Sequence, residues 1–221
     1  MDKLTEILAK RPNILLDFDG PVCDLFAHLT ERQAARELVT ALNSPLLDQV
    51  ADANDPFDIL EYIAHRNPDL AAKIERRLAD IEVRAAGSAP LAAGADEVIR
   101  RAAGRGVVAI VSNNAPEAID TYLRAQGLRE CVAGVFGRTS ADVSGLKPST
   151  RLLDEAMTTL GIDSDTCVYV GDSTTDIEAA DGAGMPAIAL ASGSDDRDEL
   201  ASHKPVALIE SMTELRDALA D

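Results

Sequence analysis

The chain contains no tryptophan, and its four phenylalanines and three tyrosines make up only 3% of the 221 residues. Aromatic platforms that stack nucleic-acid bases are therefore not expected, and the core must be built from aliphatic side chains. Cysteine is also scarce, because Cys23, Cys131 and Cys167 form an odd and widely separated set. This pattern argues against a disulfide framework and against a paired-cysteine zinc site, and it fits a reducing compartment.

Positive charge is the second shortage: 21 lysines and arginines face 38 acidic residues, for a formal net charge of -17 at pH 7. Phosphate backbones and anionic membranes would repel such a chain, so we expect neither nucleic acid nor a membrane as a partner. No apolar run approaches the roughly 18 residues of a spanning helix. The polar, amphipathic segment 1–11 is unlike a signal peptide. The sequence thus predicts a soluble, cytoplasmic protein.

Short apolar runs alternate with helical segments along most of the chain. The runs are continuous, as is typical of strands that are buried on both faces of a parallel sheet. An alternation of this kind predicts an α/β fold with a doubly wound parallel sheet and a Rossmann-like core. The predicted strands are 14–18, 107–111, 132–136, 167–170, 187–190 and 206–209, and the predicted helices between the later strands are 96–103, 116–126, 150–160 and 176–183.

One connection is far longer than a usual strand-to-helix loop. Between Gly20 and Gly87 the pattern is helical only, over 25–42, 56–64 and 70–86, with prolines at the internal turns. This predicts a small all-helical insert after the first strand. The predicted domains are a core of residues 1–22 and 87–221 and a helical cap of residues 23–86. The acidic stretch 195–199 is predicted to be a solvated loop.

Ligands of an open parallel sheet bind beyond the carboxyl ends of its strands, so the residues that follow each strand are the candidates. Asp17 and Asp19 follow the first strand and lie on one side of it, with Gly20 permitting an immediate turn. Two carboxylates this close repel each other unless a cation or a proton lies between them, which suggests a hard metal ion. The simpler alternative is an Asp-Gly turn in which Asp19 caps the next segment.

Polar residues also follow the second strand, where Ser112 and Asn113 precede a helix. Asn114 and Glu117 have the spacing of a capping box, and backbone N–H groups at such a helix start, together with the Ser112 hydroxyl, would suit a phosphate. The alternative is a plain capped helix. Lys147 lies ahead of another helix, and in a chain with few cations it is a candidate phosphate clamp, or otherwise a solvated loop lysine.

The fourth strand is followed by Gly171, Asp172, Ser173 and Asp176. A capping box with Ser173 could explain Asp176, but no such reason covers Asp172. All these residues belong to one edge of one sheet. Four carboxylates supply enough oxygen ligands for Mg²⁺, and the hydroxyl, backbone donors and lysine supply what a phosphoryl group requires.

The ordered set Asp17-Phe18-Asp19-Gly20, Ser112-Asn113, Lys147-Pro148 and Gly171-Asp172 with Asp176 resembles the four motifs of the haloacid dehalogenase-like hydrolases. The resemblance covers nearly the whole chain, including the place of the helical insert, and is closest to the phosphoglycolate phosphatase-like group. One departure is Pro21, which stands where family members commonly carry threonine, so that a hydroxyl and a backbone donor are missing.

This resemblance implies a phosphatase that acts on a small phosphorylated metabolite, as a monomer or homodimer. It implies Asp17 as the nucleophile that forms an aspartyl-phosphate, and Asp19 as the acid that protonates the leaving alcohol and then serves as base. Mg²⁺ would be held by Asp17, the Asp19 backbone carbonyl, Asp172 and, directly or through water, Asp176. The substrate phosphate would be held by Ser112, Asn113 and Lys147.

Other functions of the same scaffold stay open at this point. They are a sugar-phosphate mutase, a dehalogenase, and a catalytically silent phosphate-binding or signalling protein. The dehalogenases that resemble this chain lack the second acid, so Asp19 favours phosphoryl chemistry. Receiver-like signalling domains are about half this length and lack an insert after the first strand, which counts against them.

Overall fold

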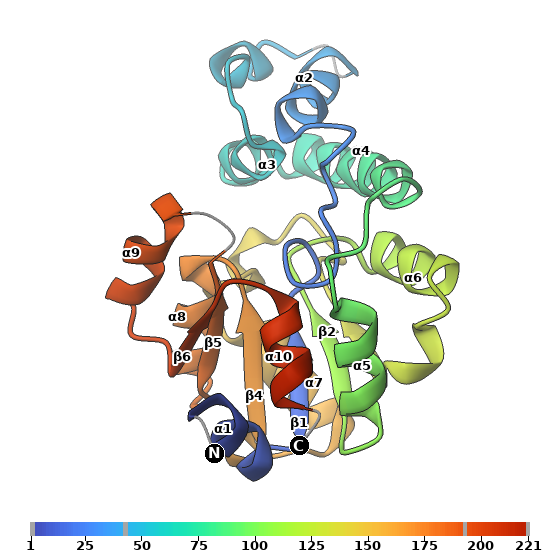
Figure 1. Cartoon of the computed structure of the whole chain (residues 1–221). Coiled ribbons are helices and arrows are strands. Elements are labelled where there is room, and N and C mark those ends of the chain that lie inside the picture. Colours follow the sequence, from blue (N-terminus) through green and yellow to red (C-terminus); the bar gives the residue numbers. More distant parts are fainter. Residues whose placement is uncertain (1–2, 42–43, 192–193, 220–221) are drawn as a thin grey trace.

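The computed structural model describes residues 3–41, 44–191 and 194–219. Within these residues a six-stranded parallel sheet forms the centre of the molecule, in the order β3-β2-β1-β4-β5-β6 (Figure 1). Strand β1 pairs with β2 on one side, where Ile14 lies opposite Val108, and with β4 on the other side, where Ile14 lies opposite Val168. The strands are β1 (Asn13–Leu16), β2 (Val108–Val111), β3 (Gly134–Phe136), β4 (Cys167–Gly171), β5 (Ala187–Leu190) and β6 (Ala207–Ile209).

Helices cover both faces of the sheet, so the side chains of each strand divide between two apolar clusters. Ile14 and Leu16 of β1 pack with the cluster that includes α1, α5, α6 and α10, whereas Leu15 packs with α7 and α8. Both sets are buried, which explains why the strands are continuous aliphatic runs. The helices are α1 (Lys3–Lys10), α5 (Ala95–Ala103), α6 (Pro116–Ala125), α7 (Arg151–Leu160), α8 (Thr174–Gly182), α9 (Ser194–Ser202) and α10 (Met212–Ala218), with short 3-10 turns η2 (Arg129–Cys131), η3 (Val143–Gly145) and η4 (Ser164–Thr166).

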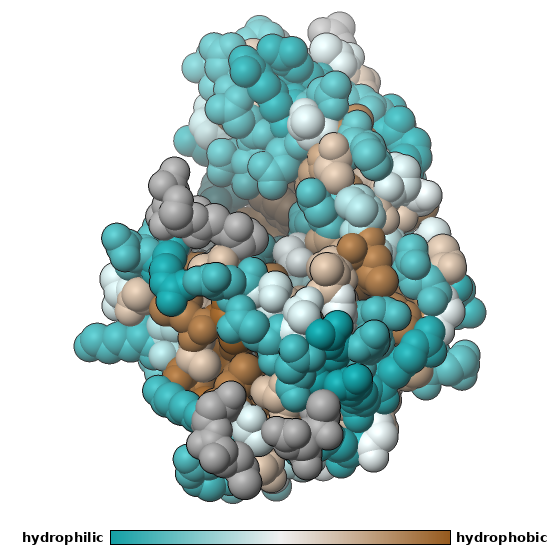
Figure 2. Space-filling view, in the orientation of Figure 1, coloured by the Kyte–Doolittle hydropathy of each residue, from teal (hydrophilic) through white to brown (hydrophobic). Residues whose placement is uncertain are grey.

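The long connection after β1 contains α2 (Glu31–Ala41), η1 (Leu47–Val50), α3 (Pro56–Ala64) and α4 (Pro68–Ala86). Together these elements form the helical insert, which lies above the sheet in Figure 1 and presents a mostly hydrophilic outer face in Figure 2. Its two linkers run side by side, because Asp24 N–H donates to Pro90 O and Ala92 N–H donates to Val22 O. The insert has apolar side chains of its own in the core, among them Leu38, Ile59 and Leu78.

The predicted α/β class and parallel sheet are confirmed. Each predicted strand is present within two residues of its predicted bounds, and β5 has the bounds that the sequence suggests. The predicted loop at 195–199 is wrong, because α9 (Ser194–Ser202) occupies it. Helix α10, which the sequence reading overlooked, packs against α5. The domain limits at 22/23 and 86/87 stay a prediction.

Among the described residues, no helix is both long and apolar enough to cross a bilayer.

Candidate active site

Three strands of the sheet deliver carboxyl or hydroxyl groups to one edge. Asp17 follows β1 directly, Ser112 follows β2 and Asp172 follows β4. Asp17, Asp172 and Asp176 each offer a carboxylate oxygen within 4.8 Å of the others. Because neighbouring parallel strands end at the same edge, residues 155 positions or more apart in the chain meet here.

Gly20 permits the close approach of the first and fourth strand ends. Its φ of +89° lies in the left-handed region, and a Cβ at this position would collide with the Asp172 carboxylate. The turn around it closes through Gly20 N–H to Cys23 O, and through Val22 N–H and Cys23 N–H to Phe18 O. All three donors belong to residues other than Pro21, so the turn closes with proline at this position.

Lys147 reaches the same acids from the loop before α7. Its ammonium lies 2.9 Å from Asp17 Oδ1 and 2.5 Å from Asp176 Oδ1, and its side chain is only 3% exposed. It also donates to the Tyr169 hydroxyl at 2.9 Å, and that hydroxyl donates to Val111 O. Burial alone would lower the pKa of Lys147, but the two carboxylates outweigh burial and raise it. The lysine therefore lies charged within the acidic site, and it is no solvated loop residue.

Asp176 has a double role in the geometry. It forms the capping box at the start of α8 with Ser173, as its spacing suggests. Its Oδ2 accepts hydrogen bonds from Asp172 N–H, Ser173 N–H and the Ser173 hydroxyl, while Oδ1 faces Lys147. With both oxygens already engaged, Asp176 is well suited to orient Lys147 and the Asp172 loop around the site.

The electrostatics of the site require a cation or protons. Burial and the charges of Asp17, Asp176 and Asp19 raise the pKa of Asp172 to about 8. Burial, followed by the charges of Asp17 and two further acids, raises the pKa of Asp19 to about 7 against the opposing hydrogen bond from Leu25 N–H. Burial also raises the pKa of Asp17, and the Lys147 ammonium opposes the rise. A bound divalent cation would keep these carboxylates ionised.

The second strand end is organised differently from the prediction. Asn114 does not cap α6 with Glu117: the helix begins after Ala115, and Asn114 accepts a hydrogen bond from the Ser112 hydroxyl at 3.0 Å. Asn113, predicted to bind phosphate, clamps the backbone of Lys147. Its Oδ1 accepts from Lys147 N–H at 2.8 Å, and its Nδ2 donates to Lys147 O at 3.2 Å.

Two residues that the sequence reading missed lie behind this loop. Glu82 of α4 accepts hydrogen bonds from Ala115 N–H at 2.9 Å and from Asn114 Nδ2 at 3.1 Å, and it pairs with Arg138 at 2.8 Å. The sequence does contain one indication of Arg138. This residue follows β3 by two positions, so it lies at the same edge of the sheet as the other candidates. In a chain with few cations, an arginine at a strand end is a candidate site residue for the same reason as the acids at the neighbouring strand ends.

Two cavities separate the helical insert from the site. One of about 340 Å³ reaches Asn113 and Lys147, and its wall on the insert carries Asp55, Asp58 and Glu61. The other, of about 520 Å³, reaches Asp19 and Asp172, and its wall also carries the acids Asp24 and Glu31 beside Phe26 and Thr30. Among the described residues that line the two cavities, Lys147 is the only cation. A molecule in these cavities meets mostly negative charge away from Lys147.

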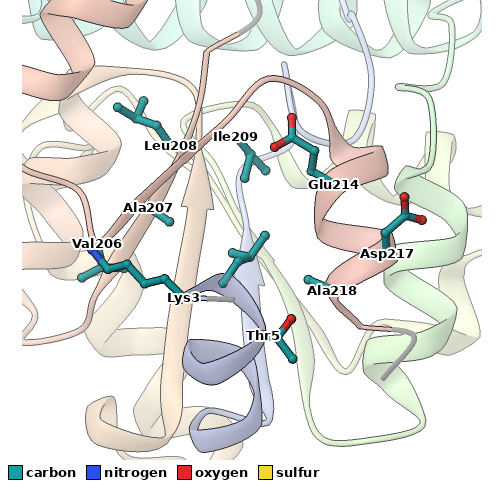
Figure 3. Close-up of a pocket in the computed structure, with 10 residues that line it drawn as sticks. Lys3, Thr5, Val206, Ala207, Leu208, Ile209, Glu214, Asp217 and Ala218 are labelled. Carbon is teal, nitrogen blue, oxygen red and sulfur yellow. The ribbon is translucent and has the colours of Figure 1, made fainter. Parts of the chain in front are cut away.

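A larger hollow of about 680 Å³ lies elsewhere, between α1, β6 and α10 (Figure 3). Its lining includes Lys3, Val206, Leu208 and Glu214. It is formed by the N-terminal helix and the edge strand, away from the strand ends that hold Asp17 and Asp172 (Figure 1). It therefore takes no part in the candidate site.

Comparisons with known proteins agree with the geometry. The HAD-hydrolase-like family matches residues 146–215. A phosphoglycolate phosphatase of Synechococcus elongatus is 32% identical over 110 residues, which span 50% of this chain and 50% of that enzyme. A phosphoglycolate phosphatase of Mesorhizobium japonicum is 27% identical over 229 aligned residues, covering 96% of each chain. The structure of CbbY from Rhodobacter sphaeroides in complex with phosphate has a TM-score of 0.72 at 21% identity and covers 96% of this chain and 100% of that chain.

The family match and the phosphatases among the similar sequences support a hydrolase of the phosphatase class. The chain is similar to the haloacid dehalogenase-like hydrolases over residues 146–215, and its fold is similar to that of solved members of that superfamily. The relatives with similar sequences are phosphoglycolate phosphatases, which supports the resemblance to that group. The resemblance seen in the sequence is thereby confirmed.

Proposed function

We propose that this protein is a Mg²⁺-dependent phosphatase that hydrolyses a small phosphomonoester through an aspartyl-phosphate on Asp17. The observation that supports this most is the convergence of Asp17, Asp172 and Asp176 within 4.8 Å, with the Lys147 ammonium 2.9 Å from Asp17. A carboxylate can approach an anionic phosphate only where cations neutralise both groups. The site contains one cation, the Lys147 ammonium, and a set of carboxylate oxygens that suits a divalent metal ion as a second cation.

In the first half of the reaction, an Asp17 carboxylate oxygen attacks phosphorus, and the bond from phosphorus to the leaving oxygen breaks. Asp19 donates its proton to that oxygen, so an alcohol leaves. The pKa of about 7 makes Asp19 able to hold this proton at neutral pH. Ser112 and Lys147 hold the phosphoryl oxygens while negative charge shifts among them.

In the second half, water attacks the phosphorus of the aspartyl-phosphate, and Asp19 takes a proton from the water. The bond between phosphorus and Asp17 breaks, phosphate is released and both acids return to their starting state. During both halves of the reaction, hydrogen bonds from Lys147 and from the Asp172 N–H to Asp176 keep these groups in place.

The buried carboxylates fit a hard divalent cation because Mg²⁺ prefers oxygen ligands. The raised pKa of Asp172 also shows, through burial first and like charge second, that ionised acids here need a compensating cation. Asp17, Asp172 and the Asp19 backbone carbonyl would hold the ion, with Asp176 beside them. When bound, Mg²⁺ would neutralise charge on the phosphoryl group and on the acids around it.

The lining of the cavities also bears on the leaving group. In phosphoglycolate the leaving alcohol carries a carboxylate, which in this chain would face Asp58 and Glu61 of the insert. Like charges in a partly desolvated cavity repel strongly. We therefore propose that the preferred substrate has a neutral or cationic leaving alcohol.

The test is a screen of phosphomonoesters with purified protein and Mg²⁺, with released phosphate as the readout. We expect turnover that EDTA abolishes and Mg²⁺ restores, and a higher kcat/KM for a neutral alkyl phosphate than for phosphoglycolate. No release of phosphate from any ester would refute the phosphatase, and a preference for phosphoglycolate would refute the leaving-group argument alone. Product analysis with sugar phosphates separates hydrolysis from a mutase reaction.

A further inference from the structure

A charged pair is completely buried at the junction between the helical insert and the core. Glu82 lies on α4 of the insert and Arg138 lies in the core after β3, and neither side chain is exposed to solvent. Arg138 Nη1 and Nη2 donate to the two carboxylate oxygens of Glu82 at 3.1 and 2.8 Å, which is the fork geometry of a strong pair.

Both members of the pair also hold the loop that follows β2, residues 112–115, here called the β2 loop. Glu82 accepts from Asn114 Nδ2 and from Ala115 N–H, while Arg138 Nη1 donates to Asn113 O at 2.7 Å. The Arg138 N–H donates to Asn114 O at 3.0 Å. The backbone of the loop is thus fixed on three successive residues by groups from outside it.

The same loop leads directly to the phosphate-binding groups of the proposed function. Asn114 Oδ1 accepts the hydrogen bond of the Ser112 hydroxyl. The Asn113 side chain exchanges two hydrogen bonds with the backbone of Lys147. Ser112 is therefore two contacts from Glu82, and Lys147 is two contacts from Arg138.

Arg138 contacts the insert at further points. Its guanidinium lies 5.2 Å from the centre of the Phe57 ring on α3, and Glu75 Oε1 of α4 is 3.5 Å from its Nε. The side chain of a core residue is therefore enclosed by the insert. A buried ion pair contributes little net stability compared with apolar side chains of similar volume, so stability alone does not account for charges here.

We propose that Glu82 and Arg138 are positioning residues that orient Ser112 and Lys147 for phosphate binding, and that they make this orientation depend on the seating of the helical insert. The proposal rests on the proposed function. It assigns to the last helix of the insert a role in building the phosphate site, in addition to covering it.

The test compares Glu82→Gln, Arg138→Lys and the apolar double variant Glu82→Leu/Arg138→Met with wild type. The control is Glu37→Gln, because Glu37 of α2 also accepts from two arginines, Arg77 and Arg84 of α4, but contacts no core residue through these bonds. Three quantities are measured with Mg²⁺ present: kcat and KM for p-nitrophenyl phosphate, the Kd of inorganic phosphate by calorimetry, and the thermal midpoint.

We expect Glu82→Gln to lower both kcat and phosphate affinity by roughly 10- to 100-fold, the range for loss of hydrogen bonds to a charged group. The control should change neither. The double variant should recover part of the thermal midpoint that Glu82→Gln loses, because it removes both charges of the pair although Glu75 and the loop lose a partner, yet keep the low kcat and weak phosphate binding. Arg138→Lys keeps the charge without the fork and should give an intermediate loss.

Recovery of kcat and phosphate affinity together with stability in the double variant would overturn the proposal, since the pair would then be structural only. Unchanged phosphate affinity in a folded Glu82→Gln or Arg138→Lys protein would overturn it as well. These outcomes leave the proposed function intact. A wild-type protein that neither hydrolyses esters nor binds phosphate would instead refute the proposed function and this proposal with it.

Discussion

Asp172→Asn offers a sharp test of the electrostatics of the site, in the absence of any substrate. Burial and the neighbouring acids raise the pKa of Asp172 to about 8 in the folded protein, from an ordinary value of 3.8. Between pH 3.8 and about pH 8, Asp172 is protonated in the folded state and ionised in the unfolded state. Asp172 therefore disfavours folding, by an amount that grows as the pH rises through this window. The asparagine variant lacks this penalty.

The size of the effect follows from the shift. One unit of pKa corresponds to about 1.4 kcal/mol, so from about pH 5 to about pH 7.5 the variant should gain up to about 3 kcal/mol of unfolding free energy over wild type. This is an upper limit, because Asp17 adjusts its own protonation when its neighbour changes. We expect a measured gain of roughly half that limit or more.

The assay is urea unfolding with EDTA at both pH values. The matched control is Asp181→Asn, which removes the same charge from the exposed part of α8. Addition of Mg²⁺ should stabilise wild type at the higher pH and stabilise Asp172→Asn much less, because the variant has lost a ligand. An equal stability difference at the two pH values would show that Asp172 is not an uncompensated buried carboxylate, and the case for a cation site would lose its main support.

Three further variants and one titration test the catalytic roles. Asp17→Asn should lower kcat by about 10³-fold or more with its thermal midpoint within a few degrees of wild type, since it removes the nucleophile; activity near wild type would exclude that role. Asp19→Asn should cost roughly 10²- to 10⁴-fold with an alkyl phosphate but less with p-nitrophenyl phosphate if the first step limits the rate, because a good leaving group needs no proton; equal losses would argue against an acid role. Lys147→Ala should weaken the binding of inorganic phosphate about 10-fold or more in calorimetry, and an unchanged Kd would leave the lysine without a phosphate role. Titration of EDTA-treated protein with Mg²⁺ should restore turnover along a saturation curve, and metal-independent turnover would contradict the assignment of the acids as ligands.

The layout of the sheet and its polar edge could be predicted because both depend on local sequence. Buried parallel strands are short aliphatic runs, and a polar residue that follows such a run must lie at the edge of the sheet. Lys147 could be selected in the same way, although nothing local showed that two carboxylates and Tyr169 surround its ammonium.

The rest of the site depends on partners that are distant in the sequence. Asn114 and Glu117 have the spacing of a capping box, yet Glu82, 33 residues before Ala115, takes the backbone donor at that helix start. The Ala115 N–H donates to the buried Glu82 carboxylate and not to a capping side chain. A buried carboxylate without donors would cost more free energy than a helix without a side-chain cap. Such competition has no signature in a single stretch of sequence. The helix at 194–202 was missed for the opposite reason, since acidic residues tolerate a helix and a loop alike.

The position of Tyr169 has a practical outcome. The chain has no tryptophan and three tyrosines, so its ultraviolet emission comes from phenol rings alone. One of these rings is anchored by its hydroxyl to the Lys147 ammonium at the centre of the site. We expect changes in the charge around that lysine to alter the emission of this ring, which can be measured without an attached dye.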